Sequence, residues 1–386
     1  MSLSGACAIA GVYEHPTRWA PDKTEFQIMA ESAKGALDDA GLTINDVDGL
    51  FGASMTMGAM GIVELAEYLN LKPTYIDGTN IGGSSFLAHV SHAAAAIHAG
   101  MCKVAIVLYG STAASNAVAI GTGMGHGSRN PWDSFQSPYG MTTVGSYAMV
   151  AQLHMQRYGT KPEQLAEIAV TMRRHASMNP VAKMRTPITV DDVLSSRLIS
   201  APLHLLDCCI ISDGGGAIVV TSTERAKDLR RKPVQILGCG ESVCHQEIGA
   251  PDLLTMGARQ AGELAFGMAG VQRSDIDLAM VYDSFTITVL STLENLGFCK
   301  VGEGGDFVSG GRIGLGGELP VNLDGGGLSS NHPGMRGIFL AIEATKQLRG
   351  ECGERQVANA KLAVAHGTGG TLGVAHSGAT LILGVE

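Results

Sequence analysis

The chain has 386 residues, a length at which more than one hydrophobic core is expected. Its charged fraction is only 16%, its net charge is −9, and no lysine or arginine run exceeds residues 230–232, so nucleic acid is not an expected partner. Glycine occurs 52 times and apolar residues make up 45% of the chain, which is typical of a compact α/β enzyme.

The sequence also gives expectations about compartment and metal content. No apolar run reaches the roughly 18 residues of a membrane span, and the N-terminus leads directly into a strand without a signal peptide. The eight cysteines are scattered without paired C-x-x-C spacing. We therefore expect a cytoplasmic protein with buried thiols, no metal site and no disulfide framework.

The first hundred residues alternate between strands and helices. The pattern predicts a strand at 6–12, an amphipathic helix at 25–40, a strand after a turn at 46–51, a helix at 60–70 and a short strand at 73–76.

Gly82 and Gly83 then open an alanine-rich helix that ends at Gly100, and a buried strand follows at 104–109. The first turn of such a helix has unpaired backbone N–H groups that bind anions or hold a reactive group. Close packing of helix against strand explains the glycines equally well.

The alternation changes between about residues 111 and 198. A glycine-rich loop at 121–127 and further turns precede two predicted helices, at roughly 141–158 and 162–178. This pattern predicts an insertion that lies over the sheet, and insertions of this kind often form the substrate mouth. We expect His126 of this loop to contact a substrate, although apolar loop residues around it also cluster for packing alone.

A repeat organises the whole chain. Residues 36–48 (ALDDAGLTINDVD) align with residues 265–277 (AFGMAGVQRSDID) at a constant offset of 229, and the strands and helices on either side of these segments also correspond. The sequence therefore predicts two copies of one α/β unit, at 1–224 and 225–386, with an insertion at about 112–200 in the first. Two related halves can bring helix N-termini together at one site.

Three polar residues stand at strand or loop ends of the second copy: Tyr282, His332 and His366. Histidine titrates near pH 6.5 and is the usual general acid or base. A single loop histidine is often only a surface residue. Together, flanked by glycines and matched to one face of a duplicated sheet, these residues are the candidate catalytic groups.

These segments resemble the thiolase superfamily. Asn322, Gly325 and Gly326 followed by His332-Pro333 fit its C-terminal signature, with Asn331 in place of a glycine, and residues 212–217 look like its Ser-Asp-Gly turn. The resemblance spans the chain and is nearest to the sterol-carrier-protein-type thiolases. It implies an α/β chain with the duplicated five-layer αβαβα thiolase fold, an inserted loop domain, and at least a homodimer.

The chain departs from the family where the family performs its chemistry. Thiolases place a nucleophilic cysteine three residues after an asparagine and 17 before the glycine that ends the helix. Counting from Asn80 and from Gly100 gives Gly83 in both directions, and no cysteine stands between residues 7 and 102. The position of the second catalytic cysteine holds His366. A covalent acyl-enzyme therefore lacks its thiolate, and Ser84 or Ser85 would need a partner base to replace it.

The groups that remain suit the stabilisation of a thioester enolate. The resemblance implies His332 as an oxyanion donor, Tyr282 and His366 as acid/base groups, and the backbone at residues 83–85 at the former nucleophile position. We expect retro-aldol cleavage of a bulky β-hydroxyacyl-CoA, with a coenzyme A thioester as the substrate and no bound cofactor. Further substrate contacts are expected at the following residues: Asp283, Asn331 and Gly369.

In this respect the chain is similar to thiolase-like aldolases that shorten steroid side chains, which lack the cysteine, use tyrosines and work with a small OB-fold, zinc-ribbon partner. Tyr282 fits one such tyrosine, and His332 stands where a second would be expected. Two alternatives stay open. One is an acyltransferase with a non-cysteine nucleophile or a partner subunit, and the other is a non-catalytic acyl-CoA-binding subunit.

Overall fold

The computed structural model describes residues 3–117, 142–244, 252–372 and 374–386. The first elements are β1 (Cys7–Glu14), α1 (Glu25–Ala40), β2 (Gly49–Gly52), α2 (Gly61–Tyr68), β3 (Tyr75–Asp77), α3 (Ser85–His98) and β4 (Val104–Ser111). The next are α5 (Thr143–Tyr158), α6 (Pro162–Ser177), α7 (Val190–Ser195), β5 (Leu198–Ser200), β6 (Leu203–His204), β7 (Gly214–Ser222) and α8 (Thr223–Ala226). The last are β8 (Val234–Cys244), α9 (Gly257–Ala269), β9 (Leu278–Val281), α10 (Thr286–Leu296), α11 (Gly304–Val308), α12 (Gly337–Arg349), β10 (Leu362–Thr371) and β11 (Val374–Gly384).

The large sheet has the strand order β3-β2-β4-β7-β1-β8-β11-β10-β9. The series β2-β4-β7-β1 and β9-β10-β11-β8 share one pattern, in which the first pair is parallel and the next two pairs are antiparallel. The two series meet between β1 and β8, where Ala8 lies opposite Gln235 and Ile9 opposite Val234. The sheet therefore consists of two equivalent parts with a narrow junction.

The predicted repeat occupies equivalent places in these two parts. The Asp48 carboxylate accepts hydrogen bonds from the backbone N–H groups that start β4, and Asp277 does the same at the start of β10. Helices α1 and α9 both end at a left-handed glycine, Gly41 with φ 73° and Gly270 with φ 69°, which a residue with a Cβ rarely adopts. The boundary at residue 224 and the limits of the insertion stay predictions.

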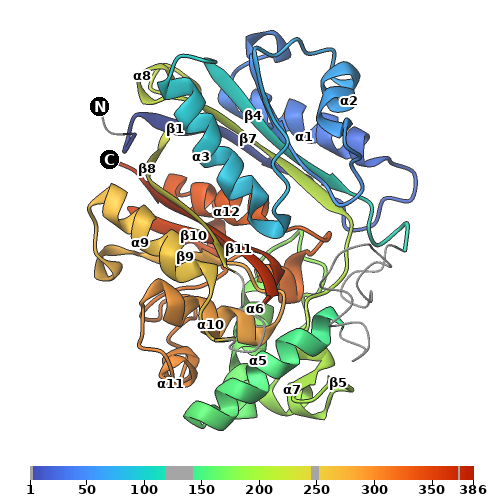
Figure 1. Ribbon diagram of the computed structural model, residues 1–386, viewed down its shortest axis with the longest axis vertical. Coiled ribbons are helices and arrows are strands. Elements are labelled where there is room, and N and C mark those ends of the chain that lie inside the picture. Colours follow the sequence, from blue (N-terminus) through green and yellow to red (C-terminus); the bar gives the residue numbers. More distant parts are fainter. Residues whose placement is uncertain (1–2, 118–141, 245–251, 373) are drawn as a thin grey trace.

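The helices complete five layers, as the family resemblance predicted. Helix α1 covers β1, β4 and β7 on one outer face, and α9 covers β8 and β11 on the other. Helices α3 and α12 contact strands of both parts and each other, and Figure 1 shows them in the middle of the molecule. Their inward side chains, Phe86, Leu87, Phe339 and Leu340 among them, are fully buried in one core.

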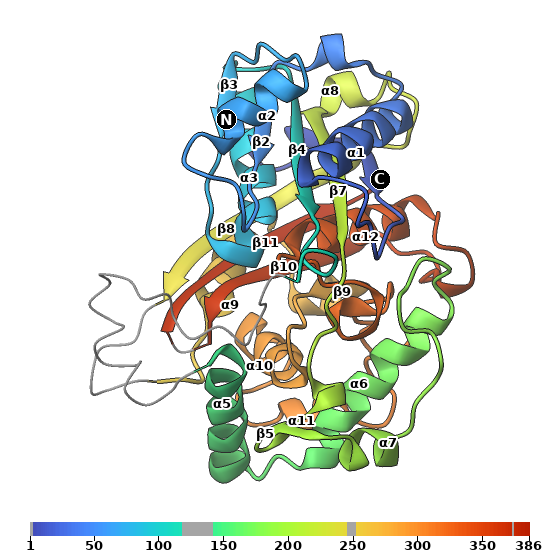
Figure 2. The ribbon, with the colours of Figure 1, turned by 90° about the vertical axis from the view of Figure 1, so that its right-hand side faces the viewer.

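Helices α5, α6 and α7 gather with α10 and α11 at one end of the molecule, and Figure 2 shows them below the sheet. The two predicted helices of the insertion are present, and each begins at a residue that suits a helix start. Thr142 caps α5 by accepting from the N–H of Gly145, and Pro162 occupies the first position of α6. Within the described ranges, no helix has the length and apolar character to cross a bilayer.

The helix predicted to open at the glycine pair begins later than expected. Gly82 has φ 72°, which is outside the helical region, and a short 3₁₀ turn at Gly82–Ser84 precedes α3 at Ser85. A Cβ on Gly82 would lie 2.8 Å from the Cα of Gly369. The glycine therefore allows this turn to pack directly against the backbone of β10.

Candidate active site

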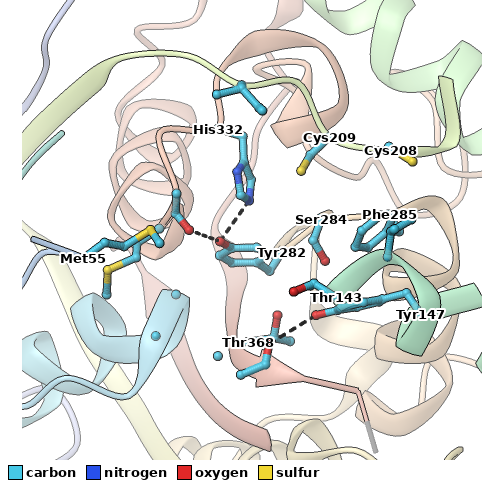
Figure 3. A pocket seen from close by; sticks show the side chains of 18 of the residues that line it. Met55, Thr143, Tyr147, Cys208, Cys209, Tyr282, Ser284, Phe285, His332 and Thr368 are labelled. Atoms are coloured by element: carbon cyan, nitrogen blue, oxygen red, sulfur yellow. Dashed lines mark hydrogen bonds between the residues drawn. The ribbon is translucent and has the colours of Figure 1, made fainter. Parts of the chain in front are cut away.

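A cavity of about 570 Å³ lies where the first turn before α3 meets the ends of β9 and β10. Most of its lining is apolar, and it combines residues from both parts of the sheet and from the predicted insertion. The lining includes Met55, Gly82, Gly83, Tyr147, Arg197, Ile199, Leu205, Cys208, Cys209, Ile211, Tyr282, Ser284, Phe285, His332, Met335, Thr368 and Gly369. Figure 3 shows Tyr282 in the centre, with His332 above it and Tyr147 below.

The ring of Tyr282 fills the space that a side chain at position 83 would need. A Cβ built on Gly83 would lie 2.2 Å from Cε2 of Tyr282 and 2.5 Å from the carbonyl oxygen of Thr368. Contacts below 3.0 Å are essentially never seen for a Cβ, so position 83 accepts only glycine while this ring is in place. The tyrosine thus occupies the space beside position 83, which the sequence predicts as the former nucleophile position.

Tyr282 and His332 form a hydrogen-bonded pair. The phenol oxygen lies 3.1 Å from Nε2 of His332, the two rings are nearly perpendicular at 88°, and the hydroxyl also lies 3.5 Å from the carbonyl oxygen of Gly334. Burial raises the pKa of Tyr282 far above its usual value. Burial and the charge of Arg336 lower the pKa of His332 to about 4. At neutral pH the pair therefore consists of a protonated phenol and a neutral imidazole.

The loop that carries His332 is held from the N-terminal part of the chain. Tyr109 on β4 donates its hydroxyl proton to the carbonyl of Pro333 and accepts a hydrogen bond of 3.0 Å from the N–H of Met335. The hydroxyl of Ser212 accepts a hydrogen bond of 3.0 Å from the N–H of His332. These contacts fix the imidazole relative to Tyr282.

Asp283 and Asn331, predicted to contact the substrate, are fully buried and do not line the cavity. The Asp283 carboxylate accepts hydrogen bonds from the N–H groups of Gly327 at 2.7 Å and Leu328 at 3.2 Å, and burial raises its pKa to about 6. The Asn331 amide donates to Glu14 at 3.0 Å. Both side chains anchor the π-helical turn at Gly326–Ser330 and the chain that follows it.

The structure does not bring His366 to the cavity. The predicted strand ended at residue 365, but β10 continues to Thr371, so His366 lies within the strand and not at its end. Its side chain is fully buried, and Nδ1 is 2.8 Å from the hydroxyl of Thr380 on β11. This geometry does not support the acid/base role predicted for His366, because the residue is absent from the cavity lining.

Ser84 and Ser85 are fully buried and do not line the cavity. The Ser84 hydroxyl lies 2.9 Å from the carbonyl of Ile81 and 2.7 Å from the hydroxyl of Ser377. The Ser85 hydroxyl donates to the carbonyl of Gly82 at 2.7 Å. No imidazole or carboxylate accepts a proton from either hydroxyl in the described hydrogen bonds, so neither is activated as a nucleophile.

Gly369 lines the cavity, and its contact with the substrate stays a prediction. The expectation for His126 concerns a residue outside the described ranges. A Cβ on Gly369 would lie 1.8 Å from the carbonyl oxygen of Ile81, so this glycine also permits a close backbone approach.

Sequence reasoning missed a group of hydroxyls and thiols on the cavity wall. Tyr147 packs its ring 4.3 Å from that of Phe285, and Figure 3 shows its hydroxyl on the same side of the cavity as Thr143, Ser284 and Thr368. The adjacent thiols of residues 208 and 209 lie near Ser284 in the same view. In the sequence, the adjacent cysteines Cys208 and Cys209, just before the Ser-Asp-Gly turn, could have indicated this part of the cavity.

Comparisons with known proteins agree with this architecture. The family model described as thiolase C-terminal domain-like matches residues 240–385. The chain is 36% identical over 364 residues to the steroid side-chain-cleaving aldolase of Thermomonospora curvata, covering 89% of this chain and 91% of that one. It is 34% identical over 369 residues to the 17-hydroxy-3-oxo-4-pregnene-20-carboxyl-CoA lyase of Mycobacterium tuberculosis, covering 90% and 92%.

Solved structures give the same result. The Ltp2-ChsH2(DUF35) aldolase matches with a TM-score of 0.89 and 33% identity, covering 100% of this chain and 99% of that one. Human mitochondrial 3-ketoacyl-CoA thiolase matches with a TM-score of 0.73 at 15% identity, over the full length of both chains, which shows a common fold. The chain therefore belongs to the thiolase superfamily and is a thiolase-like enzyme.

Proposed function

We propose that the protein cleaves a carbon–carbon bond of a bulky β-hydroxyacyl-CoA by a retro-aldol reaction without a covalent acyl-enzyme. The observation that carries this proposal is the phenol of Tyr282 in the place of the nucleophile, hydrogen-bonded to a neutral His332. The Tyr282 phenol and the His332 imidazole can transfer protons. Neither the Tyr282 phenol nor the buried hydroxyls of Ser84 and Ser85 are activated to take up an acyl group.

The proton balance of the reaction needs only this pair. Tyr282 accepts the proton of the substrate β-hydroxyl while its own proton moves to Nε2 of His332. The Cα–Cβ bond breaks, which gives a ketone or aldehyde and the enolate of a shortened acyl-CoA. The same pair then returns one proton to Cα, so the enzyme ends in its starting state.

A concerted transfer suits the electrostatics of the pair. The pKa of Tyr282 is raised by burial, so a free phenolate would be costly in this site. Passing one proton to His332 while another is accepted avoids that intermediate. The enolate oxygen needs hydrogen-bond donors, and the backbone at Gly83 and Gly369, which line the cavity, is the candidate source.

The cavity fits an apolar acyl group joined to an anionic carrier. Among the described residues that line the cavity, Arg197 carries the charged side chain, because His332 is neutral. Arg197 is exposed. Coenzyme A carries several phosphate charges, which an exposed guanidinium binds well. We assign Arg197 to the phosphates and the apolar wall, which includes Ile199, Phe285 and Met335, to the acyl group.

We also propose that a partner protein takes part in the reaction. The solved relative at 33% identity is a complex of Ltp2 with ChsH2(DUF35). Near the cavity mouth this chain exposes Leu198, Leu205 and Ile211, at 54%, 47% and 42%, which suits an apolar contact. The predicted OB-fold, zinc-ribbon partner, the homodimer and the cytoplasmic location are part of this proposal.

The test is an assay of the protein, alone and with a DUF35 partner, on tertiary β-hydroxyacyl-CoAs that carry a polycyclic acyl group. Chromatography should show equal amounts of the carbonyl product and the shortened acyl-CoA. Tyr282→Phe and His332→Ala should each abolish turnover while the circular dichroism spectrum is unchanged. Full activity in both variants would refute the mechanism.

The acyltransferase alternative has its own readout. Its support is a similarity of 32% over 361 residues to an acetyl-CoA acetyltransferase of Methanothermobacter thermautotrophicus. That chemistry predicts an acyl group bound to the protein, which mass spectrometry of the quenched reaction would detect. A trapped acyl-enzyme at Ser84, Ser85 or Cys209 would replace the retro-aldol proposal.

A further inference from the structure

A buried arginine stands directly behind the proposed catalytic pair. Arg336, the residue before α12, has no exposed surface. Its Nε donates to the carbonyl of Asn331 at 3.1 Å, its Nη2 donates to the Asp324 carboxylate, and its Nη1 has no hydrogen-bond partner among the described residues. Burial of a cation is costly, so a position this deep requires compensation or a use.

The contacts of Arg336 lead to His332. The carbonyl that its Nε holds belongs to the residue immediately before His332. A Cβ built on Gly327 would lie 3.1 Å from Cδ2 of His332 and 3.2 Å from Cδ of Arg336, so the imidazole and the arginine side chain flank the same glycine. The guanidinium therefore fixes the backbone under the imidazole and places a positive charge near it.

The charges that face this arginine come from several elements. Asp324 pairs with it directly, the Asp283 carboxylate lies 3.8 Å from its Nε, and Glu14 of β1 attracts it while pairing with Arg18. The other titratable groups that act on Tyr282 are a thiol and two phenols, which belong to Cys209, Tyr109 and Tyr147. Arg336 thus supplies the positive charge that acts on both members of the pair.

We propose that Arg336 is a positioning residue for the Tyr282–His332 pair. Its guanidinium holds the backbone that carries His332, and its buried charge keeps a second positive charge from forming on the imidazole at rest. The same charge favours the negative character that the Tyr282 oxygen gains as its own proton moves toward His332. This role rests on the proposed retro-aldol function but concerns a residue that does not touch the substrate.

The direction of the effect can be stated for each group. The positive charge lowers the pKa of His332, in addition to the effect of burial, and it opposes the increase that burial causes in the pKa of Tyr282. Loss of the charge should therefore raise both pKa values. A charge within about 4–6 Å of a titratable group shifts the pKa of that group by about one unit or more. Both limbs of the pH profile should then move to higher pH, and a purely structural role would lower activity without moving them.

The test compares two variants of the full-length chain. Arg336→Met combined with Asp324→Asn removes the two directly paired charges together, so that Asp324 is not left as an uncompensated carboxylate. Arg336→Lys keeps the charge and loses the second nitrogen contact. For both, histidine-labelled protein is titrated by NMR to follow His332, and kcat/KM is measured against pH on the β-hydroxyacyl-CoA.

We expect the double variant to raise the His332 midpoint and the acid limb by about one unit, and the lysine variant to leave them within about 0.3 units while kcat/KM falls. An unchanged His332 midpoint in the folded double variant overturns the proposal. A shift of one unit in Arg336→Lys also overturns it. If the double variant unfolds, the Arg336→Lys titration alone decides. Because the NMR titration needs no turnover, it tests Arg336 even if the substrate assay refutes retro-aldol chemistry.

Discussion

Gly83→Ala is the change that tests the reasoning about the site most directly. The new Cβ would lie 2.2 Å from Cε2 of Tyr282, whereas carbon atoms pack at about 3.5–4.0 Å, so the ring must move by roughly 1.3 Å or more. A shift of residue 83 instead of the ring is also restricted, because the carbonyl oxygen of Thr368 would lie 2.5 Å from the same Cβ. Overpacking of this kind costs about 1–3 kcal/mol of folding stability. We expect a cost near ~3 kcal/mol, because one of the two neighbours is the backbone carbonyl of Thr368, which moves less easily than a side chain.

Two measurements follow from that geometry. With an unfolding entropy of about 2.1 cal/mol/K per residue, a loss of about 3 kcal/mol lowers Tm by about 4 °C in a chain of 386 residues. A reacting group displaced by about 1 Å costs about 100-fold in rate, so kcat/KM should fall by that factor. Calorimetry and the retro-aldol assay measure the two effects in the same preparation.

A second substitution separates the ring from other causes. In a Tyr282→Ala background, Gly83→Ala should cost at least about 1 kcal/mol less, because the ring that it strikes is gone. Gly267→Ala on the exposed side of α9 is the matched control, since a Cβ there meets nothing within 4 Å and replaces glycine in a helix. Wild-type Tm and wild-type kcat/KM in Gly83→Ala would refute the placement of Tyr282.

Three further outcomes are expected. Ser84→Ala should keep kcat/KM within about threefold, because its hydroxyl serves the local backbone; a loss above about 100-fold in the substrate assay would restore serine as a candidate nucleophile. Arg197→Ala should raise KM about tenfold with little change in kcat, and Arg197→Lys should recover part of the loss; equal KM values in all three proteins would contradict the phosphate assignment. Stability should fall as the pH drops from about 6.5 toward 4, because five buried histidines, including His332 at about 4 and His366 at about 3, have pKa values lowered by burial and take up protons on unfolding. Asp283, with its pKa raised to about 6, acts in the opposite sense, and so do Asp207 and Glu343, whose pKa values burial also raises. A Tm that stays constant between about pH 6.5 and 4.5 would contradict the expectation that the five imidazoles dominate the pH dependence.

The fold could be predicted largely because its signals are local and periodic. The helix at Glu25–Ala40 has a capping threonine, an apolar stripe and a terminal glycine, and its bounds agree with the structure. The repeat at an offset of 229 could be recognised because each copy keeps an aspartate that closes the same turn. Where prediction was off by a few residues, at the start of α3, the cause was a backbone angle at Gly82 that residue type alone leaves open.

The site was harder to predict because it depends on which side a residue faces and on contacts between distant segments. His366 was placed at a strand end, but the strand continues past it and its side chain packs against β11. Tyr147 comes from the insertion and carries no motif that links it to Phe285, and its position depends on how α5 packs. The nucleophile position predicted at Gly83 stays a prediction, and the ring that packs against Gly83 comes from a residue about two hundred positions away.

The close approaches at the site join the two repeats. The Gly83 contact with Tyr282, the Gly82 contact with Gly369 and the Tyr109 bond to Pro333 each pair a residue of the first repeat with one of the second. The two repeats are joined by one covalent connection, and the basic segment at 230–232 is an exposed part of it. Cutting there would leave each fragment with half of a site, so specific activity would become dependent on protein concentration, as in a two-component enzyme.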